Sequence, residues 1–462
     1  MKKSISRDTF SRMLNSERKK TIAKSIYAAE SFSGRAFDSG IATATNSSSP
    51  AELNHQNIQT DIRLAFGKPG TNNGTIGTHP DFAELADTEN QENHFICSLF
   101  LDIKNSTRLT FIYELHEVVA IKNTILKAAA DTVRAMDGHV HRFMGDAMLA
   151  FFGGKKQSIE DSIVNAINCT SVLEALMTGT IIPVLEQTYY QDPKADYLGF
   201  RIGLDFGSTE KVLWSSYGLR GVSEVTPTSF YVDVASKLQS IAGKNKAMLG
   251  DSILSEIDFP ADYRKVRSRT QTNAKGEREI IDTPTLPRTY TDREGKQHTY
   301  KVWELSHEKY RDILPFDPEL KESFTSSNCL SCNGITYKCY RSIGEHLIEY
   351  PSVSSTLEKK ESLRFKITLG RDVYQTQKFP LELQLIKTNH GKEAQLFKSM
   401  GRYLYPKKTI FRDTNSQSPF FTGDSHVHHD STAYRGLHTM EAVIKDADGE
   451  IIFRDYIGVY IK

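Results

Sequence analysis

Two aspartates, Asp102 and Asp146, stand where a carboxylate needs an explanation. Asp102 ends the apolar run in FLDIKNST (residues 100–107), and Asp146 lies in the turn of RFMGDAMLAFF (residues 142–152). A buried carboxylate is costly unless it is paired, protonated or bound to a metal. Two facing carboxylates repel each other, and a hard cation such as Mg²⁺ or Mn²⁺ between them resolves the repulsion, as in nucleotide sites. Taken alone, each aspartate is better explained as a cap or turn residue.

The surrounding sequence predicts the elements that position these two residues. The apolar runs and their spacing predict, in order, a strand (94–103), a helix (114–136), a hairpin (139–152), a helix (159–176) and a strand (from 199). This order favours an α+β fold, a sheet with helices on one side. The hairpin can lie beside the first strand, which would bring Asp146 close to Asp102.

Composition sets the broad class of protein. The chain has 462 residues, 39% of them apolar and 25% charged, enough for two or three domains. The net charge is only +1, which does not indicate a nucleic-acid or membrane-surface partner. The start has no apolar signal core, and no stretch approaches the ~20 apolar residues of a membrane span. Five cysteines in so long a chain fit a reducing compartment, so we expect a soluble cytoplasmic protein.

Composition also divides the chain. We expect an N-terminal helix and flexible linker over residues 1–92, because the chain becomes rich in Ser, Thr, Asn and Gly after residue 33. A central domain over 93–315 contains the predicted sheet. Residues 316–462 alternate apolar and polar side chains between turns, which predicts a mainly β domain, a sandwich, and this domain shows no catalytic constellation.

The motifs around the two aspartates resemble a known family. FLDIKNST, RFMGDAMLAFF and RIGLDFGSTEKVLW (residues 201–214) are together similar to the metal signature and the next strand of class III nucleotide cyclases, and the resemblance covers residues 93–310. It implies that Asp102, the backbone carbonyl of Ile103 and Asp146 hold two metal ions, Mg²⁺ or Mn²⁺, on a nucleoside triphosphate. One ion would help ionise the ribose 3′-hydroxyl, and the other would neutralise the leaving pyrophosphate.

The sequence departs from the family pattern at the positions that read the base and hold the phosphates. Arg142 stands where purine cyclases carry lysine or glutamate, and Thr226 occupies the second base-reading position. Asp233 and Lys237 replace the usual Asn-x-x-x-Arg pair, and Phe100 can wall the base pocket. Each has an ordinary alternative: a surface charge for Arg142, a helical partner of Asp233 for Lys237, and a core position for Phe100.

The whole chain resembles the pyrimidine cyclases of bacterial antiphage Pycsar systems that end in an AGS-C sensor domain. This resemblance implies a homodimer that makes cyclic CMP or cyclic UMP on phage infection and so activates a separate effector. In the family, the metal residues of one domain face the base-reading and phosphate-binding residues of the partner. The donors of Arg142 favour CTP over UTP, since cytosine has adjacent acceptors at O2 and N3. A uridylate cyclase, an adenylate cyclase and a non-catalytic nucleotide-binding regulator stay open as alternatives.

Three cysteines of the C-terminal region form the remaining candidate site. Cys329, Cys332 and Cys339 lie in NCLSCNGITYKCY, with His346 seven residues further on. The two-residue spacing suits structural Zn²⁺, although a second closely spaced pair is missing. The alternative is a tight turn with small buried thiols.

Overall fold

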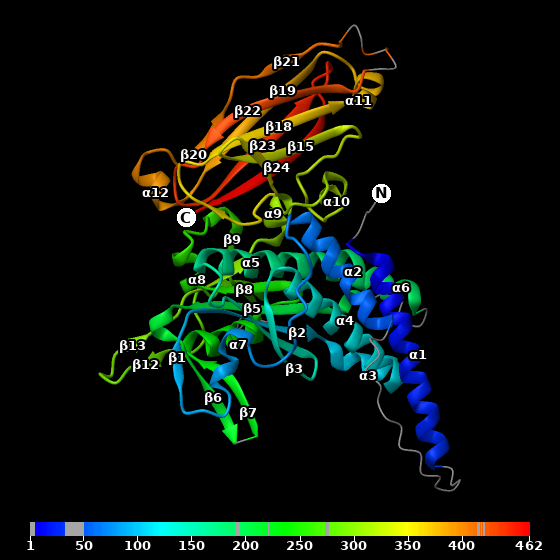
Figure 1. Cartoon of the computed structure of the whole chain (residues 1–462), viewed down its shortest axis with the longest axis vertical. Helices are drawn as coiled ribbons and strands as arrows, with labels where there is room; N and C mark the ends of the chain where they lie inside the picture. Colours follow the sequence, from blue (N-terminus) through cyan, green and yellow to red (C-terminus); the bar gives the residue numbers. More distant parts are fainter. Residues whose placement is uncertain are drawn as a thin grey trace.

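The computed structural model describes residues 5–32, 50–189, 195–219, 221–272, 277–413, 416, 418 and 421–462. Figure 1 shows a lower body of helices around a sheet, with a sandwich of strands above it. Both the α+β class and the mainly β C-terminal region are confirmed. Every element predicted around the two aspartates is present.

A seven-stranded sheet forms the centre of the lower body. Its strand order is β3-β4-β2-β5-β8-β14-β9, and all neighbours are antiparallel except β5 and β8. The strands are β2 (Ile96–Lys104), β3 (His139–Met144), β4 (Ala147–Phe152), β5 (Gly199–Gly207), β8 (Lys246–Gly250), β9 (Arg264–Val266) and β14 (Val302–Leu305). The hairpin β3–β4 therefore lies directly beside β2, as predicted.

Helices cover both faces of this sheet. The main helices are α1 (Arg7–Phe32), α2 (Pro50–Ala65), α4 (Leu115–Ala135), α5 (Ile159–Leu176) and α7 (Phe230–Ile241). Leu101 of β2 and Ile202 of β5 share one apolar core with α4 and α5. Gly203 faces the other way, and α7 packs so closely there that a Cβ atom would lie 2.1 Å from the Ala235 carbonyl oxygen. The prediction of helices on one side only is wrong.

Shorter elements complete the lower body. A small sheet of order β1-β6-β7 lies at its lower end in Figure 1. The remaining elements are η1 (Pro80–Leu85), β1 (Gln91–Asn93), η2 (Ser106–Arg108), α3 (Leu109–Ile112), η3 (Met177–Ile181), α6 (Ile182–Thr188), η4 (Ala195–Tyr197), η5 (Thr209–Lys211), β6 (Leu213–Leu219), β7 (Val222–Thr228), α8 (Asp251–Glu256), η6 (Ala261–Tyr263), β10 (Ser268–Thr272), β11 (Arg278–Asp282), β12 (Tyr290–Thr291), β13 (Gln297–His298), α9 (His307–Tyr310), η7 (Arg311–Ile313) and α10 (Pro318–Glu322).

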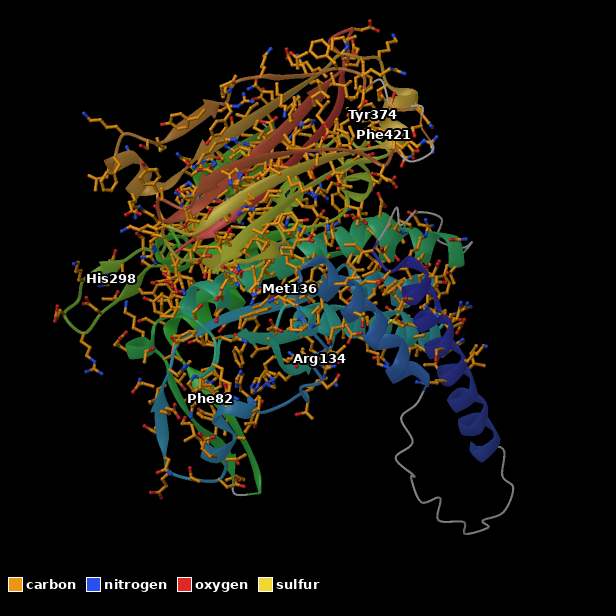
Figure 2. The ribbon with its side chains drawn as sticks, turned by 45° about the horizontal axis from the view of Figure 1, so that its top comes forward. Phe82, Arg134, Met136, His298, Tyr374 and Phe421 are labelled. Atoms are coloured by element: carbon orange, nitrogen blue, oxygen red, sulfur yellow. The ribbon has the colours of Figure 1, made fainter. Side chains whose placement is uncertain are left out.

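Residues 66–92 pack against the lower body, although the sequence predicted them as part of a flexible linker. Phe82 stacks on Trp214 with ring centroids 4.0 Å apart. Figure 2 labels Phe82 at the end of the lower body that lies away from the sandwich. The Gly77 carbonyl accepts hydrogen bonds from the rings of His139 and His141 at 2.7 and 3.0 Å. The rest of the predicted linker, residues 33–49, lies outside the described residues.

The C-terminal region is a sandwich of two sheets around one apolar core. The first sheet has the order β16-β15-β18-β22, and the second has the order β17-β24-β23-β19-β20, with β21 also paired to β19. The elements are β15 (Ile335–Ile343), β16 (His346–Tyr350), β17 (Thr356–Leu357), β18 (Ser362–Gly370), α11 (Arg371–Thr376), β19 (Leu381–Asn389), α12 (Gly391–Leu396), β20 (Gly401–Leu404), β21 (Lys408–Ile410), β22 (Gly423–Ser431), β23 (Gly436–Lys445) and β24 (Ile451–Ile461). The alternation of apolar and polar residues predicted this sandwich.

Helix α5 joins the sheet to the sandwich. The Asn168 side chain on α5 donates to the Val353 carbonyl at 2.8 Å and accepts from the Tyr310 hydroxyl at 2.8 Å. Val353 and Tyr460 belong to the same apolar core as the sheet residues. The helical stretch Ile159–Thr188 is long and apolar enough to cross a membrane, but 78% of its most apolar part is buried in the fold, so it serves here as a core helix.

A buried carboxyl group makes the stability of the fold depend on pH. Asp205 on β5 is fully buried, and its Oδ1 accepts hydrogen bonds from the Tyr300 hydroxyl and the Phe206 N–H, both at 2.9 Å. Its Oδ2 has no partner within the described residues. Burial raises the pKa of Asp205 to about 7, and the hydrogen bond from Ser252 opposes this rise.

We expect Asp205→Asn to remove a loss of stability that the wild type shows between pH 4 and pH 7. The folded state holds the Asp205 proton up to about pH 7, whereas the unfolded state releases it near its ordinary pKa of 3.8. The wild type should therefore lose on the order of 4 kcal/mol relative to the variant across this window. Urea unfolding of both proteins at several pH values measures the difference, and parallel pH profiles would contradict the assignment.

Candidate active site

The strand pairing brings Asp102 and Asp146 side by side. Asp102 on β2 lies opposite Ala147 of β4, the residue directly after Asp146. The Ile103 N–H donates to the Asp146 carbonyl oxygen at 3.1 Å, so the hairpin turn is tied to the end of β2. The predicted approach of the two aspartates is therefore present.

Each carboxylate has a partner that the sequence analysis missed. Arg201 on β5 lies directly opposite Asp102 and donates to its Oδ2 from Nε at 2.8 Å and from Nη2. The Asp102 side chain is only 13% exposed, so this guanidinium offsets much of the cost of burying its charge. The Ser106 hydroxyl donates to Asp146 Oδ2.

The oxygen atoms at this edge suit a hard divalent cation. In an antiparallel strand the N–H and the C=O of one residue point to the same side. The Ile103 N–H points to the hairpin turn, so the Ile103 carbonyl faces that turn as well. Two carboxylates and one carbonyl are the ligand type that Mg²⁺ and Mn²⁺ prefer. The residues present fit such an ion, and Asp102, Ile103 and Asp146 are the ones that would hold it.

Phe100 lies on a strand of the large sheet, and Thr226 lies on a strand of the small sheet. Phe100 lies two residues before Asp102 on the same face of β2 and packs, half-buried, against an apolar cluster that includes Leu149 and Trp214. The alternative explanation of Phe100 as a core residue therefore agrees with its packing. Thr226 is half-buried on β7 and lies opposite Ser215 of β6.

Arg142 on β3 forms a cluster with two residues that the sequence analysis did not consider. Its Nη2 donates to Glu224 Oε2 on β7. The other carboxylate oxygen of Glu224 lies 2.7 Å from His141 Nε2. The His141 side chain is fully buried, and burial lowers its pKa, while Glu224 opposes that shift. Arg142 is thus held by Glu224 at one end of its guanidinium and is more than a free surface charge.

Asp233 and Lys237 lie one turn apart on α7, over the sheet. Asp233 is exposed, and the Lys237 ammonium lies 5.6 Å from the centre of the Tyr290 ring. Among the described residues no ion pair joins the two side chains, so Lys237 is not held by Asp233. The described chain also shows no contact between the Arg142, Thr226 or Lys237 side chains and the two aspartates.

The sequence carried weak signals for the residues that were missed. Arg201 is the one basic residue in the apolar strand RIGLDFG, and Ser106 stands inside the motif that contains Asp102. Glu224 precedes Thr226 by two residues, so it shares one face of the same strand. Only the register between strands shows which charges meet.

The cysteines do not form a zinc site. Cys339 points into the sandwich core, and burial raises the pKa of its thiol to about 12. Cys329 is buried beside Asp455, with Sγ 3.8 Å from the carboxylate. Zinc requires thiolates, which burial disfavours here. In the described part of the chain no three His, Cys, Asp or Glu side chains are arranged to hold a metal, so the small buried thiols are the correct interpretation.

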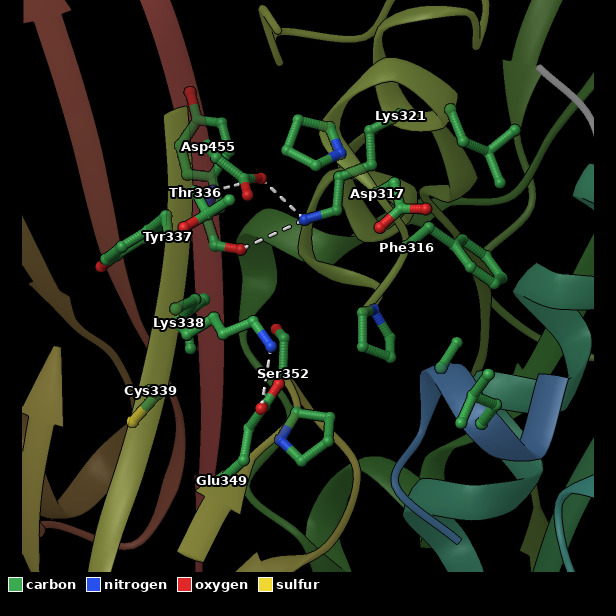
Figure 3. Close-up of a pocket in the computed structure, with 18 of the residues that line it drawn as sticks. Phe316, Asp317, Lys321, Thr336, Tyr337, Lys338, Cys339, Glu349, Ser352 and Asp455 are labelled. Atoms are coloured by element: carbon green, nitrogen blue, oxygen red, sulfur yellow. Dashed lines mark hydrogen bonds and ion pairs between the residues drawn. The ribbon is translucent and has the colours of Figure 1, made fainter. Parts of the chain in front are cut away.

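A cavity of about 390 Å³ lies apart from the paired aspartates, where the lower body meets the sandwich. Figure 3 shows Lys321 reaching Asp455 across it, with the ammonium 2.7 Å from the carboxylate. Thr336 and Lys338 of β15 form another wall. Both charges of the Lys321–Asp455 pair are almost fully buried, which makes their pairing a structural requirement of this junction.

Comparison with known proteins extends these observations to the whole chain. The family model of the adenylyl/guanylyl and SMODS C-terminal sensor domain matches residues 316–462. A cytidylate cyclase of Escherichia coli is 33% identical over 467 residues, covering 100% of this chain and 99% of that protein. A cytidylate cyclase of Staphylococcus aureus is 32% identical over 410 residues, covering 87% of each. The crystal structure of the adenylyl cyclase CyaB from P. aeruginosa covers 47% of this chain and 94% of its own, with 18% identity and a TM-score of 0.34.

The curated relatives and the matched sensor domain show a nucleotide cyclase with a C-terminal AGS-C domain. Such an enzyme acts on a nucleoside triphosphate. The identity across the whole chain shows that it belongs to the cytidylate cyclase family.

We expect Asp146→Ala to abolish turnover and leave the fold intact. The change removes one of the two carboxylates, a loss on the order of 4 kcal/mol of charge stabilisation, or roughly a thousandfold in rate. Initial rates and thermal unfolding of the purified variant measure both effects. Asp446→Ala provides a control, because Asp446 is a half-buried turn aspartate of the sandwich that accepts hydrogen bonds from the N–H groups of its own turn. A wild-type rate in folded Asp146→Ala protein would refute the metal assignment.

Proposed function

We propose that this chain converts CTP to cyclic CMP and pyrophosphate. The observation that carries the proposal is the pair of aspartates, Asp102 and Asp146, held together at the edge of β2 and β4. The full-length identity to two cytidylate cyclases supports CTP as the substrate. In the reaction the ribose 3′-oxygen bonds to the α-phosphorus, and the bond to the departing pyrophosphate breaks.

Asp102, Asp146 and the Ile103 carbonyl hold two divalent cations, Mn²⁺ or Mg²⁺, on the triphosphate. When bound, these ions supply the Lewis acidity that favours loss of the 3′-hydroxyl proton and departure of pyrophosphate. Arg201 and Ser106 keep the two carboxylates in place for this task. The hydrogen bonds of Arg201 to Asp102 and of Ser106 to Asp146 support a role of Arg201 and Ser106 in positioning the carboxylates.

Arg142, Thr226 and Phe100 form the base pocket. The Arg142 side chain is 41% exposed, so its guanidinium can meet a base from solvent. It carries only donors, which suit the O2 and N3 acceptors of cytosine. The Thr226 hydroxyl donates or accepts, and Phe100 provides an apolar wall.

Lys237 contacts the phosphates as a point charge, and Asp233 stands one turn before it on α7. The active unit is a homodimer in which Arg142, Thr226 and Lys237 of one subunit meet the metal-binding aspartates of the other. The separation of these two sets within one chain supports this arrangement, since neither set alone makes a complete site.

The cyclic nucleotide serves as a second messenger in the cytoplasm, released on phage infection to switch on a separate effector in antiphage defence. The match of residues 316–462 to a sensor domain supports regulated rather than constant synthesis. Five free cysteines among the described residues support a reducing compartment.

Competition among the four nucleoside triphosphates tests the substrate. With CTP, UTP, ATP and GTP at equal concentration and Mn²⁺ present, we expect cyclic CMP to exceed cyclic UMP by roughly 5- to 150-fold, because uracil would place N3–H against an Arg142 donor. Both pyrimidine products should exceed the purine products. Chromatography with mass detection gives the ratios directly. Mainly cyclic UMP or a cyclic purine would identify a different cyclase, and the absence of any product would favour a nucleotide-binding regulator.

Mixing two inactive variants tests the dimer. Asp146→Ala breaks the metal half and Lys237→Ala breaks the phosphate half, so a mixed dimer retains one whole site. Random pairing of equal amounts should restore about a quarter of the wild-type rate. Asp102→Ala mixed with Asp146→Ala is the control and should stay inactive, because both changes break the same half. No recovery in verified mixed dimers would count against the shared site.

A further inference from the structure

Glu224 lies where two distant strands meet, and it connects two different side chains. One carboxylate oxygen accepts from Arg142 Nη2 on β3, and the other lies 2.7 Å from His141 Nε2. The opposite ring nitrogen, His141 Nδ1, is 3.0 Å from the Gly77 carbonyl oxygen. A carbonyl oxygen can only accept, so Nδ1 carries a hydrogen, and the short contact to Glu224 also needs a proton between its atoms. The buried His141 ring therefore holds the Glu224 carboxylate in place from the protein side.

The solvent side of this cluster is open. The Glu224 side chain is 33% exposed, compared with no exposure for His141. A carboxylate has about four acceptor positions, so two contacts leave room for a further donor. Arg142 Nη1 has no partner within the described residues and presents two more N–H groups. An acceptor and a donor thus stand side by side at the exposed end of the cluster.

We propose that Glu224 and Arg142 read the base together, and that Glu224 is the residue that distinguishes cytosine from uracil. This inference rests on the proposed pyrimidine cyclase function. Cytosine presents a donor at N4 beside acceptors at N3 and O2, which matches Glu224 next to Arg142. Uracil presents an acceptor at O4 and a donor at N3, so both of its groups would oppose their partners. Thr226, two residues after Glu224, shares the same face of β7 and completes the surface.

The pairing also explains how one arginine can discriminate. A lone guanidinium on an exposed side chain can rotate to meet either O2 or O4, because both are acceptors. The bond to Glu224 fixes its plane, and the buried Nε without a partner in the described chain shows that the base of the side chain is enclosed. A fixed donor beside a fixed acceptor selects a base whose edge presents an acceptor and a donor in the matching order. Neither residue makes this selection alone.

Glu224→Gln is the variant that tests the proposal. Glutamine keeps the shape and can still accept from Arg142, but its amide also presents a donor that suits O4 of uracil. In the competition between CTP and UTP, we expect the ratio of cyclic CMP to cyclic UMP to fall by roughly 5- to 150-fold. A merely structural ion pair would lower both products equally and leave the ratio unchanged, which would overturn the proposal.

Glu308→Gln is the matched control. Glu308 is 35% exposed and forms an ion pair with Lys265, so the substitution removes a similar surface pair at the opposite edge of the sheet. Its product ratio should equal that of the wild type.

Binding of 3′-deoxy-CTP and 3′-deoxy-UTP separates this inference from the proposed function. These analogues lack the attacking hydroxyl, so their dissociation constants report base recognition even if no cyclic product forms. The wild type should bind 3′-deoxy-CTP more tightly, and Glu224→Gln should reduce that preference by the same factor as the product ratio. Equal preference in wild type and Glu224→Gln would overturn the role of Glu224, whether or not the protein cyclises CTP.

Discussion

The hydrogen bond from the Ile103 N–H to the Asp146 carbonyl oxygen is the constraint on which the paired aspartates of the candidate site depend. It is the last backbone hydrogen bond between β2 and the hairpin, next to the two residues that carry the carboxylates. A shift of one residue in this register would turn Asp102 to the opposite face of the sheet. The sheet therefore positions the site through backbone pairing, and the side chains only adjust what that pairing has already placed.

Charge in this molecule is balanced locally by residues from other strands. Arg201 meets Asp102 across β2 and β5, and Arg142 meets Glu224 across β3 and β7. In each case a half-buried carboxylate has a guanidinium beside it, which reduces the cost of desolvation.

The sequence predicted the parts of the fold that depend on local periodicity. Apolar spacing predicted the strand at 94–103, the hairpin at 139–152 and the helices before and after the hairpin in the sequence. It also predicted the approach of Asp102 to Asp146. Arg201 and Glu224 could not be predicted in the same way, because their partners lie on strands whose register no local pattern fixes. Residues 66–92 looked like a linker because their composition is polar, yet their backbone groups and a few aromatic rings bind the body. The cysteine spacing suggested zinc, but no three His, Cys, Asp or Glu side chains of the described residues are arranged to hold a metal.

The apolar core beneath α5 includes Val353, Leu437 and Tyr460 of the C-terminal region, while the inside of the sandwich has an apolar core of its own. Catalytic and sensory halves of many signalling proteins are exchanged during evolution as separate modules. Here an exchanged sensor would have to reproduce the buried contacts that Asn168 makes with Val353 and Tyr310 makes with Tyr460, as well as its own fold. The two halves are thus expected to change together over time, and a new sensor can be acquired only with a matching surface on the cyclase.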